Sequence, residues 1–236
     1  MNTQLHYITV ATKPHAILDK LIKTVNNKNE TITVLSQEED RWIGWQSNGN
    51  FGIKLKAVYD FLQRKELNDY DIVLFTDAYD VVYFGNRQEV IRRYEELDMP
   101  IIFGAEKLCN PDPWREREYS RLNPNLKTLE FPFLNSGMFI GRVWALKLSM
   151  LCYKYEDSHD DQRFWTTQYL EHPSLIKLDH NNKLFLNTAD IDIGCVEYNP
   201  IVNTVVYNSN FTPAKIAHPL FVHVNGPIKD DLHLFL

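Results

Sequence analysis

The sequence predicts an α/β fold: a single domain over residues 1–236, with a mainly parallel central sheet flanked by helices. Three observations support this prediction. Strand-like runs alternate with segments whose apolar residues recur at helical spacing. The run Ile72–Phe75 is apolar throughout, as in strands that a parallel sheet buries on both faces. The length suits one domain with a large core, and no linker or low-complexity tract divides it.

The first half of the chain alternates regularly between the two kinds of element. Strands are predicted at residues 5–12, 31–35, 72–75 and 100–103, and helices at residues 18–25, 53–62 and 86–97 between them. This alternation is typical of a doubly wound sheet with right-handed crossovers. Ligands of such sheets bind beyond the carboxyl ends of the strands, so residues that follow a strand are the candidates for function.

The second half is less regular. Residues 110–132 are rich in Pro, Arg, Glu and Asn, and we expect a long irregular loop there, a kind of segment that is usually functional or mobile. A strand is predicted to end at Leu134–Gly137. A helix over residues 143–155 and a second helix that begins at Asp160 are expected to follow it, and short strands and loops to complete the chain.

Charge and composition exclude several classes of function. The formal net charge of −6 and the absence of a block of Lys and Arg disfavour a nucleic-acid partner. Cys109, Cys152 and Cys195 are scattered without C-x-x-C spacing, which predicts neither a disulfide framework nor a zinc site. No apolar stretch approaches the roughly 20 residues of a membrane span, and no secretory signal is visible at the N-terminus. We therefore expect a soluble, cytoplasmic protein.

Two aspartates follow the most apolar predicted strand, in the motif Phe75–Asp80. Asp77 and Asp80 are three residues apart on a predicted turn, so both carboxylates can reach one cation. Mg²⁺ and Mn²⁺ prefer such oxygen ligands. The alternative is that the acids only shape the turn. Phosphatases of the haloacid dehalogenase type also end a buried strand in aspartates, but theirs are two residues apart, so the spacing disfavours that chemistry.

The motif His223–Lys229 near the C-terminus suits contact with a metal-bound diphosphate. His223 is a candidate third metal ligand. Gly226 would let backbone amides approach a phosphate, and Lys229 would neutralise diphosphate charge. The alternative for His223 is a structural, hydrogen-bonded histidine.

Acidic and amide side chains in two further motifs are candidates for function. Asp160 and Asp161 open a predicted helix, where capping is the alternative interpretation for either acid alone. Two consecutive acids exceed what capping needs. Asn135, in the motif Leu134–Gly137, carries an amide that can bind sugar hydroxyls, and a plain turn is the alternative there.

These motifs give the chain a resemblance to the glycosyltransferase domain of the multifunctional procollagen lysyl hydroxylases, in order and over nearly the full length. The match is densest in Phe75–Val82. It also includes the segments Ile8–Thr12, Gly52–Lys54, Leu134–Gly141, Asp160–Gln162, Leu178–His180 and His223–Pro227. Several motifs in register make the resemblance specific. The chain departs from the family near Asn110, where the family has a tryptophan, although Trp114 lies close by.

The resemblance implies a GT-A (Rossmann-like) glycosyltransferase domain that binds a UDP-sugar and Mn²⁺. Asp77, Asp80 and His223 would hold the metal ion that bridges the diphosphate of the donor. Val10, Thr12 and Tyr79 would bind the uridine of the donor. Asn225, Gly226 and Lys229 would lie near its phosphates. Lys54 would be a further donor-binding residue.

The reaction implied by the resemblance is transfer of glucose from UDP-glucose to galactosyl-hydroxylysine of collagen or a collagen-like protein, with retention of the anomeric configuration. Asp160 and Asp161 would be catalytic residues that face the transferred sugar and the acceptor, and Asn135 would line the same pocket. The open alternatives are another UDP-sugar such as UDP-galactose, a non-collagen acceptor, or a non-catalytic UDP-sugar-binding module.

Overall fold

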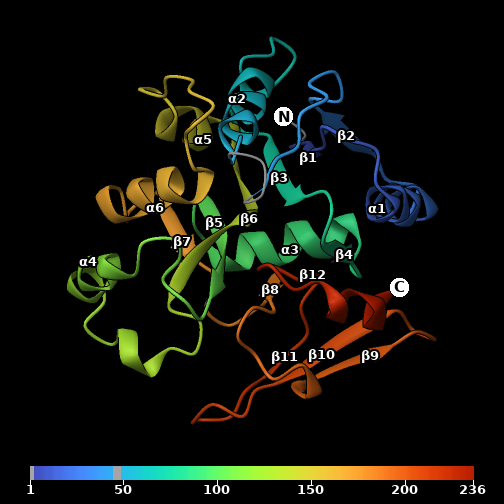
Figure 1. Cartoon of the computed structure of the whole chain (residues 1–236), viewed down its shortest axis with the longest axis vertical. Coiled ribbons are helices and arrows are strands. Elements are labelled where there is room, and N and C mark those ends of the chain that lie inside the picture. The colour runs from blue at the N-terminus through green and yellow to red at the C-terminus, as the bar shows by residue number, and fades with distance from the viewer. Residues whose placement is uncertain (1–2, 45–48) are drawn as a thin grey trace.

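The computed structural model describes residues 3–44 and 49–236, and its centre is a six-stranded sheet in the order β2-β1-β3-β6-β5-β7 (Figure 1). The six strands are β1 (Leu5–Val10), β2 (Ile32–Leu35), β3 (Ile72–Asp77), β5 (Ile101–Glu106), β6 (Phe133–Arg142) and β7 (Ile176–Leu178). Neighbouring strands are parallel except that β6 runs antiparallel to both β3 and β5. The predicted α/β class with a mainly parallel sheet is therefore confirmed.

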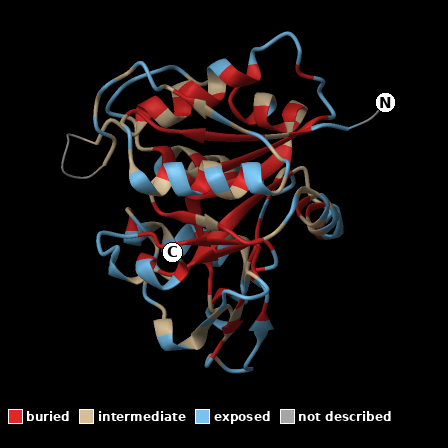
Figure 2. Cartoon of the chain, turned by 90° about the vertical axis from the view of Figure 1, so that its right-hand side faces the viewer, coloured by how far each residue is buried: buried red, intermediate tan, exposed pale blue. Residues whose placement is uncertain are grey.

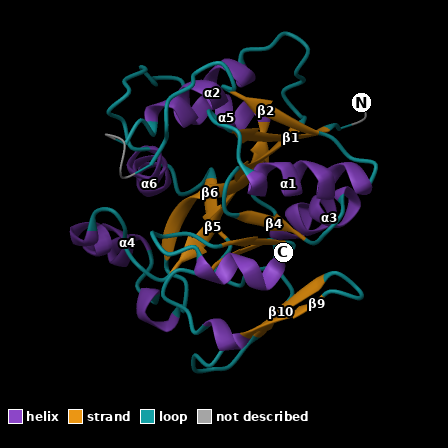
Figure 3. Ribbon diagram, turned by 45° about the vertical axis from the view of Figure 1, so that its right-hand side comes forward, coloured by secondary structure: helices purple, strands orange, loops and turns teal. Residues whose placement is uncertain are grey.

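Helices cover both faces of this sheet (Figures 1 and 3). They are α1 (Ala16–Asn27), α2 (Gly52–Leu62), α3 (Arg87–Leu97), α4 (Glu116–Leu122), α5 (Val143–Ser149) and α6 (Asp161–Glu171). Successive side chains of a strand point to opposite faces. Accordingly Ile8 of β1 packs in one core cluster with α2, α5 and α6, and Tyr7 packs in another with α1 and α3. Figure 2 shows the strands buried between helices whose outer sides are exposed.

Local sequence explains where α3 lies and which way it faces. The side chain of Asn86 accepts a hydrogen bond from the backbone N–H of Glu89 at 3.0 Å, which caps the start of the helix. Val90, Tyr94 and Leu97 recur at helical spacing and are buried. Apolar periodicity thus places the helix against the sheet, as the sequence predicts. Within residues 3–44 and 49–236, no helix is long and apolar enough to cross a membrane.

Two small sheets lie beside the central one (Figure 1). One contains β4 (Val81–Tyr83), β12 (Phe221–His223) and β8 (Phe185–Asn187), and the other contains β9 (Val196–Asn199), β10 (Thr204–Asn208) and β11 (Ile216–Ala217). In the first, β12 pairs antiparallel with β4 and parallel with β8. This register aligns His223 with Val81 on one side and with Asn187 on the other. A C-terminal strand is thereby carried to the end of β3.

Three predictions for the second half of the chain are wrong. The segment 110–132, expected to be an irregular loop, contains α4 (Glu116–Leu122) because the buried side chain of Tyr119 packs into the core. The strand expected to end at Gly137 continues to Arg142 because Phe139 and Ile140 remain buried between β3 and β5. Asn135 is therefore near the start of an antiparallel strand, and only the reversed direction of β6 brings it to the carboxyl ends of the parallel strands. The helix expected over residues 143–155 ends at Ser149, because the apolar side chain of Leu151 is exposed and gives no packing for a further turn.

Candidate functional site

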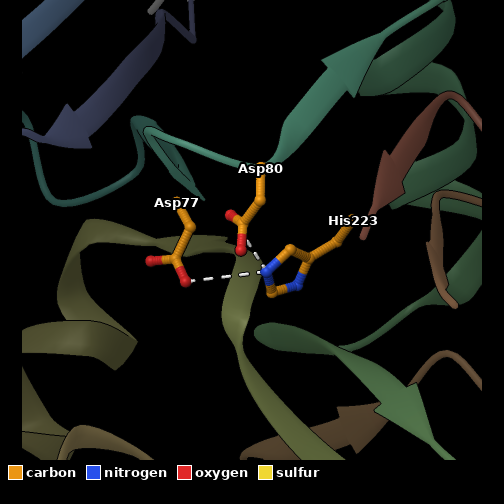
Figure 4. Close-up of side chains that lie close together, drawn as sticks. All are labelled: Asp77, Asp80 and His223. Carbon is orange, nitrogen blue, oxygen red and sulfur yellow. Dashed lines mark ion pairs between the residues drawn. The ribbon is translucent and has the colours of Figure 1, made fainter. Parts of the chain in front are cut away.

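Three side chains that can ligate a metal converge at the end of β3 (Figure 4). His223 Nε2 lies 3.2 Å from Asp80 Oδ1 and 3.7 Å from Asp77 Oδ2. One ligand atom from each residue lies within 4.8 Å of the other two. Two carboxylate oxygens and one imidazole nitrogen at this spacing can surround a single divalent cation.

The backbone around this cluster explains the convergence. Asp77 is the last residue of β3, and Asp80 directly precedes β4. The backbone N–H of Val224 donates to the carbonyl of Asp80 at 2.9 Å, which fixes His223 beside it. Gly137 of β6 leaves room for the imidazole, because an added Cβ there would lie 2.3 Å from His223 Cε1. A strand with a side chain at this position would fill the place of the histidine ring.

Asn187 of β8 determines which nitrogen of His223 is free. The amide Nδ2 of Asn187 donates to the carbonyl of Ala105 at 2.9 Å, so its Oδ1 faces His223 Nδ1 at 2.9 Å. A carbonyl oxygen only accepts, so Nδ1 must carry the hydrogen in the neutral ring. The lone pair is then on Nε2, the atom that points toward the two aspartates. Asn187 was not singled out by the sequence, because nothing near it in the chain marks it.

Two lysines hold the outer oxygens of the same aspartates. Lys229 Nζ lies 2.5 Å from Asp80 Oδ2, and Lys54 Nζ lies 2.7 Å from Asp77 Oδ1. Burial by itself would raise the pKa of Asp80, but His223 and Lys229 outweigh burial and lower it. Both aspartates thus keep one oxygen free to face His223.

Lys54 is itself a buried cation between two acids. Its ammonium also lies 3.6 Å from Asp161 Oδ2. Burial would lower the pKa of Lys54, whereas Asp161 and Asp77 raise it, and the net shift is upward. Lys54 therefore stays charged and links α2 to β3 and to the start of α6.

The two acids at the start of α6 have different surroundings. Asp160 accepts a hydrogen bond from the backbone N–H of Arg163 at 2.9 Å, so it caps the helix, and burial raises its pKa. Asp161 is buried and accepts a hydrogen bond from Ser136 Oγ at 2.9 Å. Burial raises the pKa of Asp161, and Lys54 partly opposes the shift. Asp160 thus caps the helix, and the carboxylate of Asp161 lies beside Lys54 and Ser136.

Glu106, the last residue of β5, is a site residue that sequence reasoning missed. Its carboxylate accepts hydrogen bonds from three amides: Asn135 Nδ2 at 3.2 Å, Asn225 Nδ2 at 2.8 Å and Gln162 Nε2 at 2.6 Å. Burial raises the pKa of Glu106 to about 7, and the hydrogen bonds from Gln162 and Asn135 oppose the shift. The rule that ligands bind beyond strand ends could have found it, because it lies three residues after the predicted strand at 100–103.

The amides around Glu106 are held in one orientation by the backbone. Asn135 Oδ1 accepts from Gly137 N at 2.9 Å, and Asn225 Oδ1 accepts from Ala189 N at 2.8 Å. Both Nδ2 groups must then point at Glu106. The structure thus brings Asn135 and Asn225, from distant parts of the chain, onto one carboxylate next to the Asp-Asp-His group.

The residues predicted at the uridine lie at the end of β1, beside the aspartates. Val10 aligns with Asp77 in the pairing of β1 with β3. Tyr79 OH accepts hydrogen bonds from the backbone N–H groups of Thr12 and Lys13, at 3.0 and 2.9 Å, and donates to the carbonyl of Lys13 at 3.0 Å. Thr12 Oγ1 is buried and has no hydrogen-bond partner among the described residues. Gly226, with φ +86°, adopts the left-handed conformation that favours glycine.

The mainly parallel sheet, with an Asp-Asp-His group and a buried lysine at its carboxyl edge, places the chain in the GT-A fold class. Mouse xyloside xylosyltransferase 1, in its apo form, has the same fold, with a TM-score of 0.50 at 12% identity over 96% of this chain and 99% of that one. The chain belongs to the PLOD GT domain family, whose model matches residues 1–235. The resemblance found in the sequence is thereby confirmed.

Curated relatives from several animals are similar over almost the whole chain. A procollagen-lysine,2-oxoglutarate 5-dioxygenase of Drosophila melanogaster is 29% identical over 99% of this chain and 32% of its own length. The multifunctional procollagen lysine hydroxylase and glycosyltransferase of Caenorhabditis elegans is 29% identical, and LH3 of Homo sapiens is 28% identical, each over 98% of this chain and 31% of its own length. The chain therefore spans about a third of these relatives. Neither the fold nor the relatives support the cytoplasmic location expected from the sequence.

Proposed function

We propose that this domain is an Mn²⁺-dependent retaining glycosyltransferase that transfers glucose from UDP-glucose to galactosyl-hydroxylysine of collagen or a collagen-like protein. The observation that carries the proposal is the convergence of Asp77, Asp80 and His223, which bring one ligand atom each within 4.8 Å of one another. Membership of the PLOD GT domain family supports a sugar donor and a protein acceptor. The names of the relatives support procollagen as the acceptor class.

The cluster has the chemistry that a divalent metal requires. Asp77 and Asp80 each keep one oxygen free of lysine, and Asn187 leaves the lone pair of His223 on Nε2. These three residues would hold the ion. When bound, Mn²⁺ would stabilise the negative charge that develops on UDP as the bond between the sugar and phosphate breaks.

The order of strands supports a donor that lies along the sheet edge. The carboxyl ends of β1, β3 and β5 and the start of β6 lie along one edge of the sheet in the order β1, β3, β6, β5, and adjacent strands are just under 5 Å apart. Three such steps span about 14 Å. In our proposal the uridine lies over β1 at Val10, Thr12 and Tyr79, and the diphosphate lies at the metal site beside β3. The sugar then reaches β6 and β5.

The remaining predicted residues have roles that follow from this order. Asn225, Gly226 and Lys229 lie in the segment after β12 and would approach the diphosphate, and Lys54 would add positive charge beside Asp77. Asp161 and Asn135 would contact the transferred sugar, with Asp160 at the edge toward the acceptor. A carboxylate near the anomeric carbon favours the positive charge that develops there.

The test is UDP release from a panel of UDP-sugars, with and without a galactosyl-hydroxylysine peptide, in Mn²⁺ and in excess chelator. We expect release with UDP-glucose that depends on both peptide and Mn²⁺. Asp77→Ala and Asp80→Ala should abolish it, whereas the exposed control Asp19→Ala should not change it. Full turnover in excess chelator would exclude a role of Mn²⁺ in the reaction. Faster UDP release from UDP-galactose than from UDP-glucose would make UDP-galactose the donor. UDP binding without turnover of any UDP-sugar would indicate a non-catalytic binding module.

A further inference from the structure

The segment between β5 and β6 forms an open groove of about 390 Å³. Its lining is mainly apolar and includes Leu108, Pro113, Leu126, Leu129, Pro132 and Phe133. Leu108 has 42% of its surface exposed, and the neighbouring Trp114 has 69% exposed. Large apolar side chains gathered at an open groove are typical of a surface that binds a partner.

This groove is joined to the candidate site by one side chain. Gln162 Nε2 donates to Glu106 Oε1 at 2.6 Å and to the carbonyl of Asn110, which lines the groove, at 2.8 Å. Gln162 directly follows Asp161, and Phe133 of the groove lies two residues before Asn135 on β6. The groove therefore begins one hydrogen-bonded side chain away from the residues assigned to the sugar.

The proposed orientation of the UDP-sugar directs its sugar toward β5, on the side of the groove. In the proposed donor orientation the nucleotide lies over β1 and the sugar reaches β6 and β5, so the acceptor would meet the sugar on the side of β5. The segment around α4, green in Figure 1, follows β5 directly and leads into β6. Its groove lies where the chain that carries the acceptor residue would pass.

We propose that the groove binds an extended, apolar stretch of the acceptor polypeptide next to the residue that receives the sugar. The inference rests on the proposed function and adds the place and chemistry of acceptor recognition. The polar residues of the lining are Lys107, Asn110, Glu116 and Lys127. Lys107 is paired with Glu130 and the carbonyl of Asn110 with Gln162, so the lining offers a polypeptide more apolar surface than it offers a second sugar convergent polar groups. An extended peptide that places apolar side chains in such a groove gains affinity from their burial.

The test compares two acceptors that differ only in polypeptide: a collagen-like peptide carrying galactosyl-hydroxylysine, and free galactosyl-hydroxylysine. Leu108→Asp and Leu129→Asp should raise KM for the peptide about tenfold or more, with kcat unchanged. KM for the free amino acid and affinity for UDP should stay as in the wild type. Leu148→Asp is the control, because Leu148 lies on α5 and has 50% of its surface exposed.

Binding of the labelled peptide in the presence of Mn²⁺ and UDP, followed by fluorescence anisotropy, separates this inference from the proposed function. One outcome is that the wild type binds the peptide, the two groove variants do not bind it, and no UDP-sugar supports turnover. That outcome would support the groove as the peptide site and contradict the proposed function. Equal effects of the variants on both acceptors would overturn the groove. So would peptide binding by the folded groove variants as tight as that of the wild type or of Leu148→Asp.

Discussion

At the scale of single residues, the site depends on partners that fix the state of each functional group. His223 can offer Nε2 to a metal because Asn187 accepts the hydrogen on Nδ1. Asn187 is in turn oriented by the carbonyl of Ala105. A histidine without this partner would exchange between two neutral tautomers, and only one of them can ligate at Nε2.

We therefore expect Asn187→Ala to raise the Mn²⁺ concentration needed for half-maximal activity by about 10- to 100-fold, as is typical for loss of a residue that orients a metal ligand. The measurement is a Mn²⁺ titration of UDP release. Excess Mn²⁺ should restore most of the rate, and the exposed Asn181→Ala serves as control. An unchanged titration curve in a folded Asn187→Ala variant would show that the tautomer is fixed in another way.

Glu106 gives the site a pH dependence near neutrality. Its folded pKa of about 7 lies above the usual 4.5, so between these values the folded protein holds a proton that the unfolded chain has lost. The contribution of Glu106 to stability is therefore greatest below about pH 4.5 and declines as the pH rises to about 7. Activity should change in the opposite sense, because only the ionised carboxylate can accept all three amide hydrogen bonds.

We expect kcat/KM to rise as the pH passes through about 7, and Glu106→Gln to lower the rate and remove this rise. A glutamine amide would turn a donor toward Asn135, Asn225 or Gln162, which also donate. The measurement is a pH profile of transfer to the peptide, with the exposed Glu118→Gln as control. A Glu106→Gln profile that parallels the wild type would assign the pH dependence to another group.

At the scale of elements, Lys54 connects three of them. It lies near the start of α2, and its ammonium is beside Asp77 at the end of β3 and Asp161 at the start of α6. Only 13% of its side chain is exposed, so solvent screens these charges weakly. Removal of the cation would leave the buried carboxylate of Asp161 and the partly buried carboxylate of Asp77 without compensation.

Lys54→Met should therefore lower the free energy of unfolding in the metal-free protein by about 3–5 kcal/mol. Lys56→Met on the same helix is the matched control, because Lys56 pairs with Asp60 on the exposed face. That exposed pair should contribute about 0–1 kcal/mol. Urea denaturation followed by circular dichroism measures both. Equal losses in the two variants would mean that Lys54 acts as an ordinary surface cation.

At the scale of the whole molecule, the proposed ligands connect segments that are far apart in the chain. The end of β1, the end of β3, the segment after β12 and the start of α6 all meet at one edge of the sheet. A ligand that contacts all of them binds only the folded chain. Binding should therefore stabilise the whole domain and not one element.

UDP and Mn²⁺ together, at about 100 times their Kd, should stabilise the fold by about 2.7 kcal/mol. For a chain of this size that corresponds to a rise in Tm of about 5–11 °C. Thermal unfolding with UDP alone, Mn²⁺ alone and both together measures it, and Asp77→Ala should abolish the joint effect. A full shift with UDP in excess chelator would contradict a site in which metal and diphosphate bind together.

Much of the fold could be predicted because each element carries its own pattern. Burial of a strand on both faces gives the apolar run Ile72–Phe75, and burial of one face of a helix gives the spacing of Val90 and Tyr94. Both patterns lie within a single element and can be read from the sequence. The direction of β6 could not be predicted, because a central strand buried on both faces has the same apolar run whether it is parallel or antiparallel. For that reason Asn135 was expected at a strand end and lies near a strand start. The single-domain boundary, the donor and the acceptor stay predictions.

The sequence alone determined the part of the site that is local: Asp77 and Asp80, three residues apart after a buried strand, are bound to lie together. Only the tertiary structure decided which distant groups join them. His223 reaches Asp80 through the register of β12 with β4, and Asn187 reaches His223 through the register of β12 with β8. Burial raises the pKa of Glu106, and the amides of three other segments that oppose this shift are also brought to it by the fold. Such contacts join residues with no shared local pattern, so only the folded chain fixes the tautomer, charge and position on which the chemistry depends.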